Sequence, residues 1–310
     1  MKTAFVILVF ILFLMEQGGA QNPEKIDAYL KELYKNSVIP GFSIIVVKNG
    51  KVFFEKGYGK ERIGSPKPFT AKSICSIGSL TKSMTALAVM QLVGQGKIGL
   101  DKPVVQYIPW FRAANKERSD KITVRMLLDN TSGLYVDNVS FTSNSAMDPL
   151  EQRVRSLAHI YLTREPGISY TYSNVGFSVA GLIVSKVAGM SYGQFVQQNI
   201  FDRIHMVNSS VNTSAKKTLD YLPGHYYGIY NAIPAGNENN PRRLSLLPAG
   251  SLTYSNAEDI GKYLLALMNG SNNELLSVKS RDQLWTKYTS FPGLSHKEGG
   301  DNSTFGYGMG

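Results

Sequence analysis

The chain has 310 residues, of which 43% are apolar and 18% are charged, so it has enough apolar material for a large core. Its net charge is +10, but the basic residues are scattered, which favours a generally basic surface over a nucleic-acid groove. The single cysteine, Cys75, excludes an internal disulfide, and its apolar context predicts a buried packing residue. The four histidines lack metal-ligand spacing, and we expect neither a metal nor an organic cofactor.

Residues 1–20 have the pattern of a secretory signal peptide. Lys2 gives a positive start, residues 4–15 are an apolar run, and residues 18–20 offer small side chains for cleavage after Ala20. A membrane span needs about 20 apolar residues, so we expect cleavage and no stable membrane span. The sequence therefore predicts a secreted or periplasmic protein. In a eukaryotic secretory pathway, glycans could be attached at the Asn-x-Ser/Thr sequons Asn130, Asn138, Asn208, Asn212, Asn269 and Asn302.

The mature chain begins with signals for a helix and a hairpin. Asn22 as a cap and Pro23 in the first turn predict a helix start, and an apolar stripe continues through residues 26–33. Asn49-Gly50 separates two β-rich runs, which predicts a hairpin over residues 41–59. The first of these strands is apolar on both faces, so we expect helices to cover the sheet on each side.

Several apolar helices follow. A buried helix is predicted from Thr81 to about residue 93, a second in residues 173–189, and a third in residues 191–201 with Ser191 as its cap. A further helix begins near Ala257. The order is a hairpin, a helical insert and a return toward the sheet. We therefore expect one discontinuous domain over 21–310, with an α/β lobe of about 21–75 and 246–310 and a helical lobe of about 76–245.

Ser79 and Lys82 form a Ser-x-x-Lys pair at the start of the buried helix. Residues three apart lie on one helix face, and burial disfavours the charged form of lysine, so a neutral amine could take the serine proton. The alternative is a serine in the first helical turn beside a solvated lysine. The same spacing at Ser214 and Lys217 falls in a polar loop, and we interpret it as chance.

A second polar group precedes the helix in residues 173–189. Tyr172 could move a proton near a lysine, and the Asn174 amide could bind a substrate carbonyl. The repeated Tyr-Ser-Asn at residues 254–256 leads into an amphipathic helix, and we interpret that copy as a structural cap.

Four segments together resemble the serine β-lactamase-related family, and within it the group of class C β-lactamases, D,D-peptidases and esterases. They include "SIGSLTKSMTALAVMQLV", "TVRMLLDNTSGL", "YTYSNVGFSVAG" and "LPAGSLTYSNAED", in family order over nearly all of the mature chain. The resemblance implies Ser79 as the acylated nucleophile, Lys82 as its base, Tyr172 as a proton shuttle and Asn174 as a substrate-binding residue. It also implies an antiparallel sheet flanked by helices, with an inserted helical lobe and the site between the lobes.

The sequence departs from the family pattern at two places. Asn130 stands where relatives often carry histidine, at a position that is not catalytic in this scheme. The family's late strand motif, Lys-Thr-Gly or His-x-Gly, is not present, and the sequence reaches Gly310 where the preceding "FGYGMG" run begins. We expect from this a fragment that lacks C-terminal strands, with a degenerate copy as the alternative.

Two other interpretations compete with a Ser-Lys-Tyr hydrolase. Gly189 to Gly193 matches the Gly-x-Ser-x-Gly pattern, but helices on both sides make Ser191 an N-cap. A catalytically impaired homologue could instead bind a partner or act as a structural protein on the same scaffold. We expect an exported hydrolase of amide or ester bonds whose partner is a small-molecule or peptide substrate, with no nucleic acid.

Overall fold

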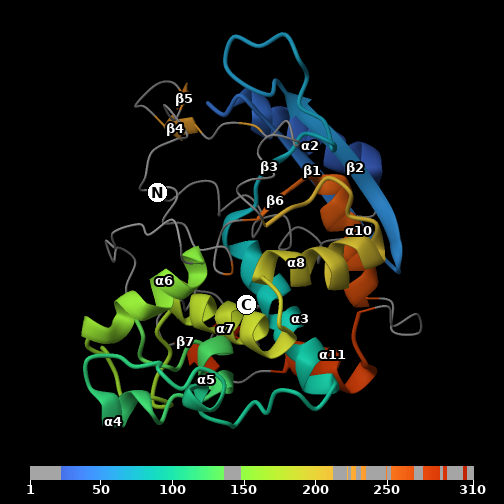
Figure 1. Cartoon of the computed structure of the whole chain (residues 1–310). Coiled ribbons are helices and arrows are strands. Elements are labelled where there is room, and N and C mark those ends of the chain that lie inside the picture. Colours follow the sequence, from blue (N-terminus) through green and yellow to red (C-terminus); the bar gives the residue numbers. More distant parts are fainter. Residues whose placement is uncertain are drawn as a thin grey trace.

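The computed structural model describes most of the chain (Figure 1). The longer described ranges are 22–135, 148–211, 253–268 and 275–286, with shorter pieces at 222, 225–227, 232–234, 249, 289–291 and 303–305. The predicted signal peptide and residues 306–310 lie outside the described residues, as do the sequons at Asn138, Asn212, Asn269 and Asn302.

The N-terminal helix and hairpin form as the sequence predicts. Helix α2 spans Pro23–Lys35, and the Asn22 side chain accepts a hydrogen bond from Glu24 N at its start. Strands β1 (Gly41–Lys48) and β2 (Lys51–Gly59) pair antiparallel around Asn49 and Gly50, which both have positive φ. Positive φ at both turn residues is what a two-residue hairpin turn requires, so the Asn-Gly prediction is confirmed.

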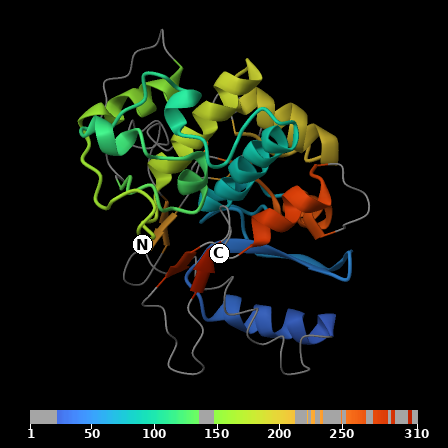
Figure 2. The ribbon, with the colours of Figure 1, turned by 90° about the horizontal axis from the view of Figure 1, so that it is seen from below.

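Helices cover the hairpin on both faces, as the sequence predicts (Figure 2). On one face, Leu30 of α2 packs with Ile44 and Tyr58 of the strands. On the other, Ile45 of β1 meets Gly261 of α10 (Ala257–Met268). Asp27 of α2 also binds β2, because its carboxylate pairs with Lys56 and accepts a hydrogen bond from Tyr58. Lys56 first, then Tyr58 and Lys31, hold the pKa of this carboxyl well below the ordinary value.

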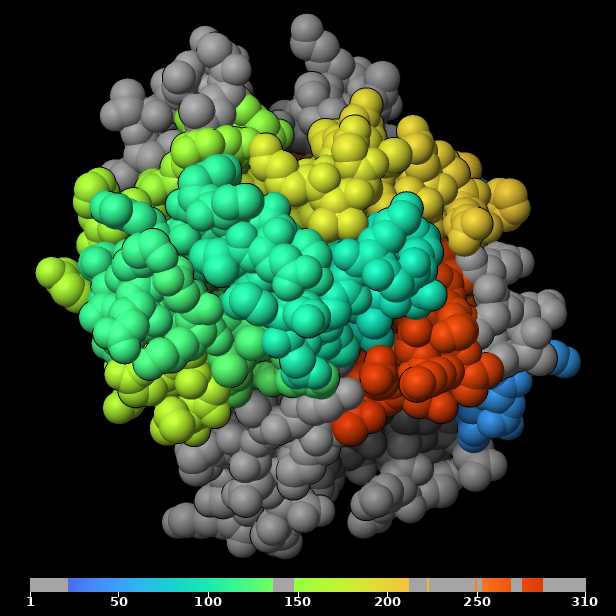
Figure 3. All heavy atoms as spheres, turned by 60° about the horizontal axis from the view of Figure 1, so that its bottom comes forward, coloured from blue at the N-terminus to red at the C-terminus, as the bar shows by residue number. Residues whose placement is uncertain are grey.

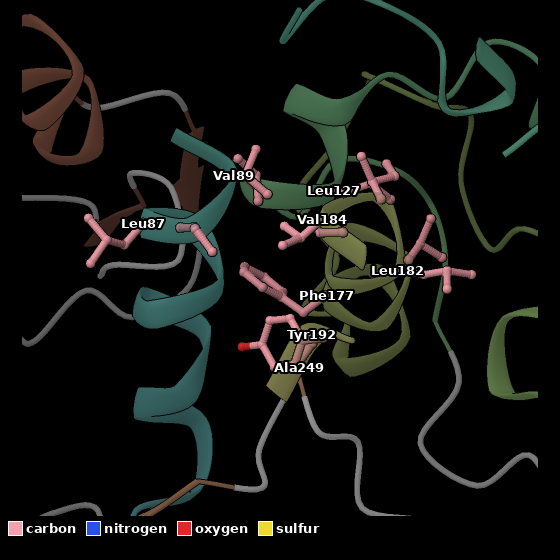
Figure 4. Close-up of a cluster of buried hydrophobic side chains, with 14 of the residues drawn as sticks. Leu87, Val89, Leu127, Phe177, Leu182, Val184, Tyr192 and Ala249 are labelled. Atoms are coloured by element: carbon pink, nitrogen blue, oxygen red, sulfur yellow. The ribbon is translucent and has the colours of Figure 1, made fainter. Parts of the chain in front are cut away.

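The main core lies between helices. Helix α3 (Thr81–Gly94) is buried around almost its whole circumference and packs against α7 (Asn174–Ala188). Phe177 and Val184 of α7 point toward α3 in Figure 4. A buried hydroxyl pair, Thr85 and Tyr192, joins α3 to α8 (Tyr192–Val196) at 2.7 Å. Ser191 caps α8 through a capping box with Gln194, as predicted for an N-cap rather than a nucleophile.

The remaining helices and strands complete this frame. Shorter helices are α4 (Lys116–Ser119), α5 (Val124–Leu128), α6 (Pro149–Arg155) and α11 (Val278–Trp285). Two-residue strands β3 (Cys75–Ser76) and β6 (Tyr254–Ser255) pair antiparallel. Further antiparallel pairs join β4 (His225–Tyr227) to β5 (Ala232–Pro234) and β7 (Thr289–Phe291) to β8 (Ser303–Phe305). Within the described residues the architecture is a mixture of helices and two-stranded antiparallel sheets, which is consistent with the predicted α/β class.

The C-terminal helices α10 and α11 contribute side chains to the core around α3 and α7. Tyr263 and Leu267 of α10 and Leu284 of α11 belong to the same buried cluster as α3 and α7. Figure 3 shows the red C-terminal segment against the cyan segment that contains the end of α3, where Gly94 lies close to Ser280. Helix α11 was not predicted from the sequence, and its sparse apolar positions explain why.

Candidate active site

Ser79 lies in a short turn, Gly78–Leu80, that leads directly into α3. Gly78 has φ +54, a conformation that favours glycine, and this turn leaves Ser79 partly exposed. The neighbouring Thr81 hydroxyl donates to Gly78 O at 2.6 Å and accepts from Thr253 N at 3.1 Å. Ile77 N donates to Thr253 O at 2.9 Å. The segment before β6 therefore fixes the turn that presents Ser79.

Lys82 is buried, with 3% of its surface exposed, and its amine faces Ser79. The Nζ atom lies 3.2 Å from Ser79 Oγ and donates to Asn174 Oδ1 at 2.6 Å. The Tyr172 ring centroid is 4.6 Å from the same nitrogen and the Phe177 ring centroid is 5.6 Å away. The alternative of a solvated helix-start lysine is therefore wrong for Lys82, since this side chain points into the protein.

Tyr172 approaches Ser79 from the segment before α7. Its hydroxyl donates to Ser79 Oγ at 2.6 Å, so the serine oxygen lies between a phenol and an amine. Burial, followed by the neighbouring Tyr172, raises the pKa of Tyr170 two residues earlier. A second phenol in this segment is therefore held in its neutral form.

The start of α7 places Asn174 beside Lys82. Ser173 is the N-cap, and its hydroxyl accepts from Gly176 N at 2.9 Å, which starts the helix at Asn174. The structure thus brings together all four residues singled out from the sequence, two from the start of α3 and two from the start of α7.

Asn130 is a residue of this neighbourhood that the sequence reasoning set aside. It is fully buried, its Oδ1 accepts from Ser173 N at 3.0 Å, and its carbonyl accepts from Thr171 N at 2.7 Å. Both partners adjoin Tyr172. The departure from the histidine of relatives was visible in the sequence, but the contact with residue 173 was not.

The remaining residues named in the sequence analysis lie outside the Ser79 site or outside the described ranges. Asn256 accepts from Asp259 N at 2.8 Å and so caps α10, as predicted for the second Tyr-Ser-Asn copy. Cys75 in β3 is half-buried as a residue, and burial raises the pKa of its thiol, which fits the predicted packing role. Ser214 and Lys217 lie outside the described residues. No group of three metal-ligating side chains is found within the described ranges.

Within the described ranges, no single helix is long and apolar enough to cross a membrane. Asn174–Ala188 and Tyr192–Ile204 reach that length and hydropathy only as a pair bent by 80°.

Comparisons with known proteins find the same family over most of the chain. A family model described as Beta-lactamase matches residues 26–310. Protein flp of Staphylococcus aureus (strain NCTC 8325 / PS 47) is 30% identical over 199 residues, which is 63% of this chain and 39% of that relative. The match therefore spans well under half of that relative's length.

Solved structures share the fold. The octameric penicillin-binding protein homologue from Pyrococcus abyssi superposes with a TM-score of 0.76 at 25% identity, over 92% of this chain and 64% of that chain. EstCE1, a hydrolase with promiscuous acyltransferase activity, gives a TM-score of 0.74 at 21% identity, over 91% of this chain and 80% of that chain. These superpositions confirm the β-lactamase/transpeptidase-like fold class.

Proposed function

The chain belongs to the β-lactamase family, and from this premise we propose that it is a serine hydrolase that forms an acyl-enzyme through Ser79. One observation carries the proposal. Ser79 Oγ lies 2.6 Å from Tyr172 OH and 3.2 Å from the buried Lys82 Nζ, so the nucleophile is within proton-transfer distance of two groups.

In the proposed acylation step, Ser79 Oγ bonds to the carbonyl carbon of an amide or ester. The serine proton passes to Lys82 Nζ, which must be neutral, and burial favours that neutral form. Asn174 Oδ1, 2.6 Å away, fixes the direction of the amine. The carbonyl oxygen becomes an oxyanion, and we expect the Ser79 N–H, in the turn before α3, to stabilise it.

The bond to the leaving group then breaks. The departing amine or alcohol takes a proton from Tyr172 OH, and Tyr172 recovers a proton from Lys82, which returns to its neutral form. In the second half, water adds to the acyl-Ser79 ester and gives up a proton to the same groups. The C–O bond to Ser79 breaks, the carboxylic acid is released, and the serine hydroxyl is regenerated.

The competing function is a non-catalytic binding protein on the same scaffold. Such a protein would not need a complete set of oxyanion donors, whereas the loss of one donor typically costs an enzyme about 10²–10³ in rate. The packing of Lys82 against Ser79 and Asn174 favours the enzyme, because a binding protein gains little from a buried lysine beside a serine.

Covalent labelling tests the proposal. We expect a fluorescent penicillin or p-nitrophenyl acetate to acylate the wild-type chain, with the added mass on the peptide that contains Ser79. Ser79→Ala should lose labelling, whereas Ser83→Ala should keep it, because Ser83 lies one turn further along α3 and bonds Leu80 O. Labelling that persists in Ser79→Ala would overturn the proposal; absent labelling in the wild type would favour the binding protein.

Export and partners are part of the same proposal. The signal-like residues 1–20 support secretion with cleavage after Ala20, so the mature chain should begin at Gln21. Mass spectrometry of the N-terminal peptide from culture medium or periplasm checks this, and an intact Met1 in that fraction would contradict it. We propose a small-molecule or peptide substrate as the partner; the octamer is a property of the Pyrococcus homologue.

A further inference from the structure

Asn130 occupies a backbone position that usually belongs to glycine. It follows α5 and its capping residue Asp129, with φ +61. Thr131 N donates to Met126 O at 3.0 Å, which is the hydrogen bond of a Schellman helix end. In that motif the left-handed residue is most often glycine and less often asparagine, because a side chain there costs conformational energy.

The side chain at this position carries a second cost. Asn130 is fully buried, and its Nδ2 has no hydrogen-bond partner in the part of the chain that the structure describes. A buried amide hydrogen without a partner destabilises a fold, because its desolvation is not compensated by a hydrogen bond. Glycine would remove both the unpaired Nδ2 and the left-handed strain. Helix termination alone therefore does not explain an asparagine here.

The hydrogen bond of the Asn130 side chain does explain it, because Oδ1 accepts from Ser173 N at 3.0 Å. The Asn130 carbonyl, which any residue would supply, accepts from Thr171 N at 2.7 Å, so one residue holds the chain on both sides of Tyr172. The other carbonyls of this segment make contacts farther from Tyr172: Thr131 O accepts from Gly167 N, and Gly133 O accepts from Thr163 N.

We infer that Asn130 is a positioning residue for Tyr172: it fixes the backbone on both sides of that tyrosine and thereby sets the 2.6 Å approach of Tyr172 OH to Ser79 Oγ. The inference rests on the proposed function for its catalytic consequence. Its structural content, a dependence of the Tyr172 position on the Asn130 side chain, stands independently.

Asn130→Gly is the informative variant, since it tolerates φ +61 and deletes only the side chain. The loss of the bond to Ser173 N is offset by the removal of the strain and of the unpaired Nδ2. We expect Tm to change by less than about 4 °C. The second-order rate of Ser79 acylation by p-nitrophenyl acetate should nevertheless fall roughly 10- to 100-fold, because a misplaced catalytic group is costly. A residue that only terminated α5 would not lower the acylation rate while leaving Tm nearly unchanged.

Asn115→Gly provides the matched control. Asn115 also accepts a hydrogen bond from a main-chain N–H, at Arg118, but it is exposed at the start of α4. The acylation rate of this variant should equal that of the wild type. An equal fall in both glycine variants would overturn the inference.

A double-mutant cycle tests whether Asn130 acts through Tyr172. In a Tyr172→Phe background the hydroxyl to be positioned is missing, so Asn130→Gly should add less than about twofold. Full additivity of the two substitutions would show that Asn130 acts on something else and would overturn the inference.

Crystal structures of the wild type and Asn130→Gly separate this inference from the proposed function. If no probe labels wild-type Ser79, the proposed function fails, and a displaced Tyr172 OH in Asn130→Gly still supports the positioning role. If Tyr172 OH stays about 2.6 Å from Ser79 Oγ in the variant, the inference is wrong whatever the activity.

Discussion

Two carboxylates near Arg125 differ in burial, and this decides the direction in which their pKa values move. Burial raises the pKa of Asp129 above its ordinary 3.8, against the opposing effects of its hydrogen bonds to Thr131 and of Arg125. Asp101 is exposed, and hydrogen bonds from Arg125 at 2.6 and 2.8 Å lower its pKa. The folded state therefore disfavours the charged form of Asp129 and favours the charged form of Asp101.

These directions predict opposite effects of two Asp→Asn substitutions. Asp129 contributes stability that is present below pH 3.8 and is lost as the pH rises through its raised folded-state value. Asp129→Asn can keep the acceptor for Thr131, so it should be more stable than the wild type at pH 7, with the advantage disappearing toward pH 4. Urea unfolding at several pH values measures this difference.

Asp101→Asn is the control with the reverse sign. Asp101 contributes stability that is present above pH 3.8 and is lost as the pH falls through its lowered folded-state value. The variant should be slightly less stable than the wild type at pH 7, and the deficit should shrink under acid conditions. The same sign for both variants would contradict the assigned causes.

The residues that could be predicted from the sequence are those with local signals. Asn22 with Pro23, Asn49 with Gly50 and Ser191 each act within four residues of their own position, so a short segment carries the whole pattern. Ser79 and Lys82 were singled out by helical spacing, which is also local. The Lys82 contact with Asn174 joins residues 92 apart. Amide chemistry made Asn174 a candidate site residue, but no local pattern predicted its contact with Lys82.

At the scale of elements, α10 lies against β1 because one of its residues is glycine. A Cβ built on Gly261 would come within 2.2 Å of Ile45 Cδ1, a distance that requires Ile45 to move. Glycine in a helix interior costs about 1 kcal/mol relative to alanine, so the close approach of strand and helix is obtained at the expense of helix propensity.

Gly261→Ala should therefore lower the stability despite better helix propensity. Overpacking a core typically costs about 1–3 kcal/mol, which exceeds the gain in propensity. Ile45→Val removes Cδ1, and the double variant should recover most of the loss, which thermal unfolding of both single variants and the double variant measures. A simple sum of the two single effects would mean that the helix does not meet the strand through this contact.

The elements also show where periodicity stops being informative. Helix α3 is buried at nearly every position, so its apolar pattern predicted a helix but gave no face toward the site. Residues 191–201 were predicted as one helix, whereas the structure has α8 followed by a wider turn over Gln197–Phe201. Sequence propensity does not distinguish these helical forms, because the hydrogen-bond register depends on packing around Ile200 and Phe201.

At the scale of the whole molecule, α3 is the central helix against which later segments of the chain pack. Residues of α7, α8, α10 and α11 all belong to the cluster that surrounds this helix, although α11 follows α3 by almost 200 residues. Ser79 and Lys82 lie at the start of the same helix. The position of the nucleophile therefore depends on packing from segments that come long after it in the chain.

This shared core makes a prediction about Leu284 in α11. Its side chain is fully buried, so Leu284→Ala should cost about 2–5 kcal/mol of unfolding free energy. Because α11 packs on α3, hydrogen exchange in α3 and α7 should become faster together with exchange in α11. Trp285→Ala, in the same helix but 53% exposed, should cost below about 1 kcal/mol and leave exchange in α3 unchanged. Calorimetry that resolves two transitions, with only one shifted by Leu284→Ala, would show instead that α11 and the helix carrying the nucleophile unfold independently.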